Sequence, residues 1–223
     1  MSGKAGLDVI EWGADAHAPP SDESALRRVR QITGEAGMTT CSYGSYWCAG
    51  RDDLDAFAAV AAAAVTLGAP RIRVWAGTEG SAHTPDRSRV IGALRDAAAI
   101  AAGRGLDVAL EFHAGTLADT PSSTVRLLDE VGHDAVSTYW QPPLDEPDDA
   151  ALAGLRTMSE RVRAVHAFSW WPGVHRLALS EREALWRGAL DLLSPVDVLL
   201  EFVPEDDPSL LEREARTLLS WLT

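Results

Sequence analysis

The stretch Val108–Thr120, VALEFHAGTLADT, contains the pattern that decides the fold. Apolar residues lead into Glu111, and His113 follows two positions later. Side chains alternate along a strand, so Glu111 and His113 point to one face while Leu110 and Phe112 point to the other. The polar run that follows opens a helix. A carboxylate at the C-terminal end of an apolar strand, just before a strand-to-helix loop, is where a (β/α) barrel places its chemistry.

The same signature returns near the C-terminus. The stretch Val196–Asp207, VDVLLEFVPEDD, places Glu201 in the same Leu-Glu-Phe context as Glu111. An acid in apolar surroundings needs a partner, because an isolated charge is costly to remove from water. Two strand-ending acids in one chain are hard to explain by packing alone, so both are candidate catalytic residues.

Strand-like and helix-like patterns alternate along the whole chain. The expected strands cover residues 8–12, 39–47, 71–76, 108–113, 135–141, 162–170 and 196–203. Helical periodicity fills the segments between them, and Thr84-Pro85 is the expected start of the third helix. Apolar strands separated by helices indicate a parallel sheet covered by helices. Because nearly every strand ends in polar side chains and no Gly-rich fingerprint follows the first, we expect a barrel without a dinucleotide site.

Composition limits the function classes. The 223 residues suit one α/β domain, 1–223, and 46% hydrophobic with 24% charged residues indicate a globular chain. A formal net charge of −13 disfavours a protein that grips nucleic acid or an anionic membrane surface. The two cysteines form no disulfide framework, and no signal peptide or apolar run of membrane-spanning length is visible. We therefore expect a cytoplasmic protein.

Five motifs at strand ends carry a family resemblance. They are IEWGADAHAPP (10–20), LEFHAGTLADT (110–120), TYWQPP (138–143), VHAFSWWP (165–172) and LLEFVPEDDP (199–208). In this order, over essentially the whole chain, they resemble the xylose isomerase-like TIM barrels. That group contains sugar and sugar phosphate isomerases, epimerases and AP-endonuclease-type proteins.

The resemblance implies a divalent metal at the C-terminal mouth of the barrel. Matched strand by strand, Glu111, Gln141, His166 and Glu201 would hold Mg²⁺, Mn²⁺, Co²⁺ or Zn²⁺. Most relatives have Asp or His where this chain has Gln141, and an amide removes one negative charge, which weakens the site. The implied reaction is proton transfer next to a carbonyl of a sugar or polyol, with a metal-stabilised enediolate. Glu111 and Glu201 would exchange the proton as base and acid.

The chain departs from the resemblance at its beginning. Relatives have a further strand and helix before the one that matches Val9–Gly13, whereas only Ser2–Gly6 precedes it here. We therefore expect about seven strand–helix units, with a barrel open between the strand at Val9 and the strand at Leu199, unless the protein starts upstream. An open gap exposes two strand edges, which favours pairing with another chain, as in a homo-oligomer.

Four further side chains are candidates for substrate binding. Arg73 points to the inner face of its strand, where it anchors an anion or hydroxyl or forms a salt bridge with Glu11 or Glu111. His113 contacts substrate or orients Glu111.

The other two candidates are His17 and Trp140. His17 follows the first strand, where it would line the mouth. Trp140 falls at a strand end, where it stacks on a sugar face or packs in the core.

Two other functions compete with a sugar isomerase. A non-catalytic barrel that binds a sugar or a protein partner fits the missing first unit and Gln141. An AP-endonuclease-like phosphodiesterase needs about three metals and many more His and Asp ligands. The chain has six histidines, of which only His113 and His166 lie at strand ends, so this alternative is weaker.

Overall fold

Parallel strands alternate with helices along the chain and join into one sheet. The computed structural model describes residues 2–83, 86–193 and 195–222. Within them, seven strands have the order β1-β2-β3-β4-β5-β6-β9, so each strand lies beside the one before it. The strands are β1 (Val9–Gly13), β2 (Thr39–Cys48), β3 (Arg71–Trp75), β4 (Asp107–Leu110), β5 (Val136–Trp140), β6 (Val162–Ala167) and β9 (Asp197–Leu200). This is the parallel barrel of about seven strands that the sequence predicted, and it is nearly closed.

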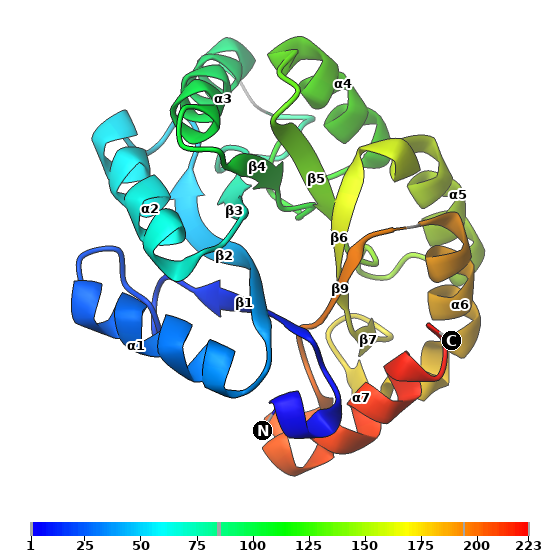
Figure 1. Cartoon of the computed structure of the whole chain (residues 1–223). Helices are drawn as coiled ribbons and strands as arrows, with labels where there is room; N and C mark the ends of the chain where they lie inside the picture. The colour runs from blue at the N-terminus through cyan, green and yellow to red at the C-terminus, as the bar shows by residue number, and fades with distance from the viewer. Residues whose placement is uncertain (1, 84–85, 194, 223) are drawn as a thin grey trace.

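Helices surround the strands, as Figure 1 shows in a view along the barrel. They are α1 (Glu23–Glu35), α2 (Leu54–Leu67), α3 (Arg87–Ala102), α4 (Pro121–Val131), α5 (Asp148–Met158), α6 (Glu183–Leu192) and α7 (Leu211–Leu219). Several begin at side-chain caps, including Asp53 before α2 and Thr120 before α4. The predicted helix start at Thr84 and Pro85 lies outside the described residues, and the cap of α3 in the structure is Asp86.

The two largest buried apolar clusters combine residues of strands and helices, whereas buried polar side chains such as Arg73 and His166 lie on the strands. Inside the barrel, Tyr139 packs in a small cluster of strand residues: Cys41, Ala109, Tyr139, Ala164 and Leu199. Below that cluster, Arg71 pairs with Asp197 at 3.0 Å across the seam side of the barrel. This packing closes the barrel from below and leaves polar chemistry to the strand ends above it.

Five of the seven strands end earlier than the sequence predicted, whereas β1 and β2 each end one residue later. The expected strand 162–170 divides into β6, which ends at Ala167, and β7 (Ser169–Trp170), which pairs antiparallel with β8 (Arg176–Leu177) in a separate hairpin. A turn over Trp171–His175 reverses the chain there, with the Trp171 amide donating to the His175 carbonyl at 2.9 Å. The apolar sequence therefore continues beyond the point where the barrel ladder ends.

The barrel is open between its first and last strands, as predicted. In the described part of the chain, β1 pairs only with β2 and β9 only with β6. A groove of about 470 Å³ follows this seam. Its walls carry side chains from β1, β9 and α7, and the short helix η1 (Ser2–Ala5) lies beside α7 at its outer end (Figure 1). The inner end of the groove reaches Glu11, Arg73, His166 and Glu201.

No helix within the described ranges is long and apolar enough to cross a bilayer.

Candidate metal centre

Side chains from three strand ends meet at the mouth of the barrel. Glu111 follows β4, His166 lies on β6 and Glu201 follows β9, and each offers an atom within 4.8 Å of those of the other two. Neighbouring strands hold the backbones of both acids, since the Glu111 amide donates to Val74 and the Glu201 amide to Ala167. Glu111 and His166 are buried, whereas 27% of the Glu201 side chain is exposed. The group is thus anchored from below and open on the side of Glu201.

Gln141 joins this group through its amide oxygen. Its Oε1 lies 3.1 Å from His166 Nδ1, and Glu201 Oε2 lies 3.5 Å from the same ring nitrogen. The structure therefore brings together the four side chains that the family resemblance selected. Their donor atoms are two carboxylates, an imidazole and an amide oxygen.

Arg73 spans two carboxylates beside this group. Its Nε donates to Glu11 Oε1 at 2.9 Å, and its Nη1 donates to Glu111 Oε2. Burial would lower the pKa of Arg73, but Glu11 and Glu111 outweigh that effect and raise it. Arg73 was predicted either to anchor an anion or hydroxyl or to form a salt bridge with Glu11 or Glu111. The structure shows salt bridges with both acids.

Glu11 belongs to the same cluster, although the sequence pattern predicted it only as a partner of Arg73. Tyr139 donates its hydroxyl to Glu11 Oε2 at 2.9 Å, and His166 Nε2 lies 3.7 Å from Glu11 Oε1. Burial would raise the pKa of Glu11, but Arg73 and His166 outweigh it and hold the pKa well below its usual range. A signal for Glu11 was present in the sequence, because it is an acid inside the short apolar strand β1, whereas Glu111 and Glu201 follow the ends of theirs.

The charges of the cluster fit a divalent cation. Three carboxylates (Glu11, Glu111 and Glu201) and one guanidinium (Arg73) leave two negative charges when His166 is neutral. Burial raises the pKa of Glu201, and Glu111 adds to this by repulsion, while His166 and Arg73 oppose it. A bound cation would relieve that repulsion. Oxygen ligands with one imidazole suit Mg²⁺, Mn²⁺, Co²⁺ and Zn²⁺, so the residues present fit the metal that the resemblance implies.

Aromatic rings border the centre on the side of β3. His113 stacks on Trp75 with ring centroids 4.7 Å apart, and Tyr46 lies 6.5 Å from the same indole. His113 Nδ1 contacts its neighbouring Ala114 carbonyl at 2.7 Å, which leaves Nε2 for another partner. His113 thus packs on Trp75, which ends β3, two residues after Glu111 in the sequence.

The structure does not bring His17 or Trp140 to the centre. His17 is exposed in the loop after β1, where its ring lies 5.8 Å from Trp12. Trp140 is buried and meets Trp186 of α6 edge to face at 5.9 Å. Alternation along β5 explains this, because Tyr139 points into the barrel and Trp140 therefore points out toward the helices. For Trp140, the structure shows packing rather than access to the mouth.

Known proteins resemble this chain in sequence and in fold. The family model described as "Xylose isomerase-like TIM barrel" matches residues 3–192. A search of curated proteins finds no match to this sequence.

Solved structures share the fold at low sequence identity. The probable 3-DHS dehydratase AsbF of Bacillus anthracis is 17% identical with a TM-score of 0.81, over 98% of this chain and 90% of that one. A xylose isomerase-like TIM barrel protein of Mycobacterium smegmatis, solved in complex with magnesium, is 18% identical with a TM-score of 0.71, over 99% and 85%. A D-psicose 3-epimerase solved in the presence of D-fructose is 16% identical with a TM-score of 0.68, over 98% and 89%.

These distant relatives thus include a sugar epimerase and a dehydratase, and one of them holds magnesium. The family match covers most of the sequence, and the seven-stranded barrel agrees with it. The chain belongs to the xylose isomerase-like TIM barrel family.

Proposed function

We propose that this protein is a divalent-metal-dependent isomerase or epimerase that moves a proton on the carbon next to a carbonyl of a sugar or sugar-like polyol. The observation that carries the proposal is the convergence of Glu111, His166 and Glu201 within 4.8 Å, with Gln141 beside them. When bound, a divalent cation polarises the substrate's carbonyl and hydroxyl oxygens and so acidifies the neighbouring C–H bond.

Glu201 and Glu111 are the groups that move the proton. Glu201 is partly exposed and its pKa is raised by burial, so it takes up and returns a proton more readily than a fully solvated acid. Glu111, whose carboxylate accepts from Arg73, is the proposed partner of Glu201 in this exchange. His113, stacked on Trp75 two residues after Glu111, is the proposed contact for a substrate hydroxyl.

The relatives support this reaction class without naming a substrate for this chain. One of them is a 3-epimerase solved with a ketose, and another holds magnesium. The dehydratase AsbF suggests a second candidate, because removal of the same kind of proton can be followed by loss of water. A phosphodiesterase with three metals has less support, since the described residues contain one such group of ligands.

The test is solvent deuterium exchange after removal of bound metal with a chelator. The folded protein is incubated in D₂O with a panel of ketoses, aldoses and cyclic polyols, with Mg²⁺, Mn²⁺, Co²⁺ or Zn²⁺ added in turn. We expect deuterium at the carbon next to the carbonyl only when a cation is present, detected by NMR and mass spectrometry. Glu201→Gln should reduce that exchange by about 10²–10⁴-fold, because it removes the proton-accepting group.

The same panel separates the alternatives. Loss of water from a cyclic polyol without isomerised product would indicate a dehydratase. Sugar binding by calorimetry without metal and without exchange would indicate a non-catalytic barrel. Absence of exchange with all four cations, in a sample shown to be folded, would argue against the proposed reaction.

A further inference from the structure

Glu11 is a buried acid that the proposed reaction does not use. It lies on β1, at the wall of the open seam, and only 12% of its side chain is exposed. The candidate ligand group consists of Glu111, His166 and Glu201, so Glu11 stands next to the metal centre without belonging to it. An unused buried carboxylate requires a reason, because burying its charge is costly.

Side chains from three other strands surround the Glu11 carboxylate. Arg73 of β3 donates to Oε1 at 2.9 Å, Tyr139 of β5 donates to Oε2 at 2.9 Å, and His166 of β6 lies 3.7 Å from Oε1. On β2, Gly44 lies beside the carboxylate, and an added Cβ there would be 2.7 Å from Oε1. The carboxylate is therefore fixed in place, and the wall of the barrel is shaped to admit it.

The two ring nitrogens of His166 face opposite acids. Nδ1 points to Gln141 and Glu201, whereas Nε2 points to Glu11. A histidine binds a cation through an unprotonated nitrogen, so the neutral ring must carry its proton on Nε2 for Nδ1 to be a ligand. Glu11 favours that tautomer, whereas the Gln141 oxygen and Glu201 favour the opposite one when no cation is present.

Glu11 also favours cation binding by a second route, which passes through Arg73. Its guanidinium is shared between Glu11 and Glu111, and it lies beside the place that a cation would occupy. Without Glu11, the positive charge of Arg73 would repel a cation and would hold Glu111 more tightly. With Glu11 present, that charge is balanced.

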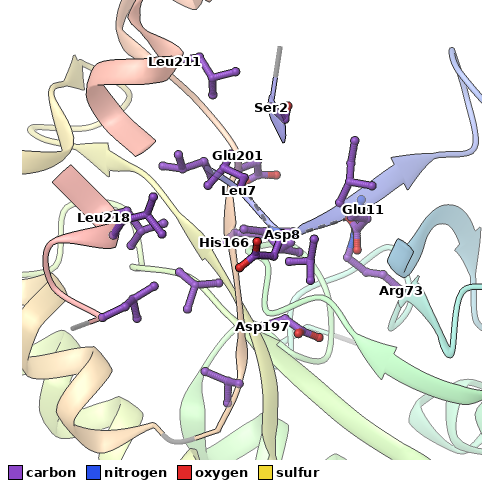
Figure 2. A pocket seen from close by; sticks show the side chains of 18 residues that line it. Ser2, Leu7, Asp8, Glu11, Arg73, His166, Asp197, Glu201, Leu211 and Leu218 are labelled. Carbon is purple, nitrogen blue, oxygen red and sulfur yellow. Dashed lines mark hydrogen bonds and ion pairs between the residues drawn. The ribbon is translucent and has the colours of Figure 1, made fainter. Parts of the chain in front are cut away.

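We propose that Glu11 is a positioning residue for the metal centre: it holds His166 with its proton on Nε2 and Nδ1 toward the cation, and it balances Arg73 so that Glu111 can bind. This inference rests on the proposed function only in requiring that the centre takes a divalent cation. Figure 2 shows Glu11, Arg73, His166 and Glu201 along the inner end of the groove.

The first test is the affinity of the full chain for Mn²⁺, measured by isothermal titration calorimetry. Glu11→Gln keeps the size of the side chain and removes its charge, and we expect the Kd to rise about 10–100-fold, as for other residues that orient a metal ligand. Tyr139→Phe keeps the charge but releases one oxygen of Glu11, so its effect should be smaller and in the same direction.

Asp197→Asn is the matched control. Asp197 is a carboxylate of the same groove and is also paired with an arginine, Arg71 at 3.0 Å. It lies four residues before Glu201 on β9, about 13 Å along an extended strand, and Figure 2 shows it well below the cluster. We expect the stability of this variant to fall and its Mn²⁺ affinity to stay within about twofold of the original protein.

The second test reads the His166 ring directly, without metal. Nitrogen-15 NMR of histidine-labelled protein reports which ring nitrogen is protonated, and a His166→Gln variant assigns the signal. Glu11→Gln should shift the ring from the Nε2-protonated toward the Nδ1-protonated form, because a neutral acceptor replaces a charged one. A merely structural role for Glu11 would leave that ratio unchanged.

The outcomes separate this inference from the proposed function. If the original protein binds none of the four cations, the metal-dependent reaction is contradicted, and the NMR ratio still decides the role of Glu11 toward His166. If the protein binds Mn²⁺ and Glu11→Gln binds it equally, with an unchanged tautomer ratio, the inference about Glu11 is overturned and the proposed reaction stands.

Discussion

Gly44 shows how a single residue makes room for charge inside the barrel. A Cβ at this position would lie 2.7 Å from both Arg73 Nη2 and Glu11 Oε1. Neither neighbour can retreat easily, because Glu11 and Glu111 hold Arg73 while Arg73 and Tyr139 hold Glu11. The contact between Glu11 and Arg73 therefore requires that position 44 has no side chain.

Gly44→Ala should break the Glu11–Arg73 contact. We expect a loss of about 1–3 kcal/mol in the free energy of unfolding, measured by urea denaturation, because extra atoms in a packed wall force side chains from their positions. Mn²⁺ affinity should fall as well. The control is Gly92→Ala in the middle of α3, where nothing lies within 4 Å of an added Cβ. That change should stabilise the helix by up to about 1 kcal/mol, and equal effects at both glycines would contradict this account of Gly44.

Residue-level prediction succeeded where a strand pattern fixed the direction of a side chain. The acids that end apolar strands, Glu111 and Glu201, lie together in the structure. Glu11 escapes this criterion, because it lies in the middle of β1 rather than at its end. Alternation relative to Gln141 would have placed Trp140 on the opposite face, toward the helices where it packs. His17 lies in a loop, whose path no such period describes.

Helix α2 illustrates what local sequence fixes at the scale of one element. Its N-cap is Asp53, which accepts from the Ala56 amide at 2.8 Å. Its C-cap is Gly68, with a left-handed φ of 76° that suits glycine. Both signals surround an alanine-rich segment that packs on β2 and β3, so the ends and the buried face of the helix are all local properties of the sequence.

Asp53→Ala should weaken α2 at its first turn. The free energy of unfolding should fall by about 1 kcal/mol, because the amides of that turn lose their acceptor. Asp55→Ala, two residues further and exposed, removes an acid from the same turn without removing the cap, so it should cost a few tenths of a kcal/mol. Urea denaturation of the pair provides the measurement, and a larger loss for Asp55→Ala would show that charge, not the cap, governs this end.

Element boundaries at the mouth were harder to predict than the elements themselves. The alternation of strands and helices agrees with the sequence pattern, but the expected strand 162–170 ends at Ala167 and its last residues enter the β7–β8 hairpin. Phe168 and Trp170 bury their apolar rings against each other, with ring centroids 4.9 Å apart, and against Phe202. Hydrophobicity along the chain does not distinguish this packing from the ladder of a barrel strand.

At the scale of the whole molecule, the seam makes β1 and β9 the weakest part of the sheet. Among the described strands, these two are hydrogen-bonded on one side only, whereas β4 is bonded on both sides. Half-buried leucines, including Leu7, Leu200 and Leu219, line the groove between them. Edge strands open at lower cost than central ones.

Hydrogen–deuterium exchange should reveal this gradient across the sheet. We expect amides of residues 9–13 and 197–200 to exchange much faster than those of residues 107–110, whose opening approaches global unfolding, because the seam strands lack a second neighbour. Mass spectrometry at low and high protein concentration is the measurement. Protection at the seam that rises with concentration would indicate that another copy pairs there, as expected for a homo-oligomer. Protection equal to that of β4 at every concentration would contradict an open seam.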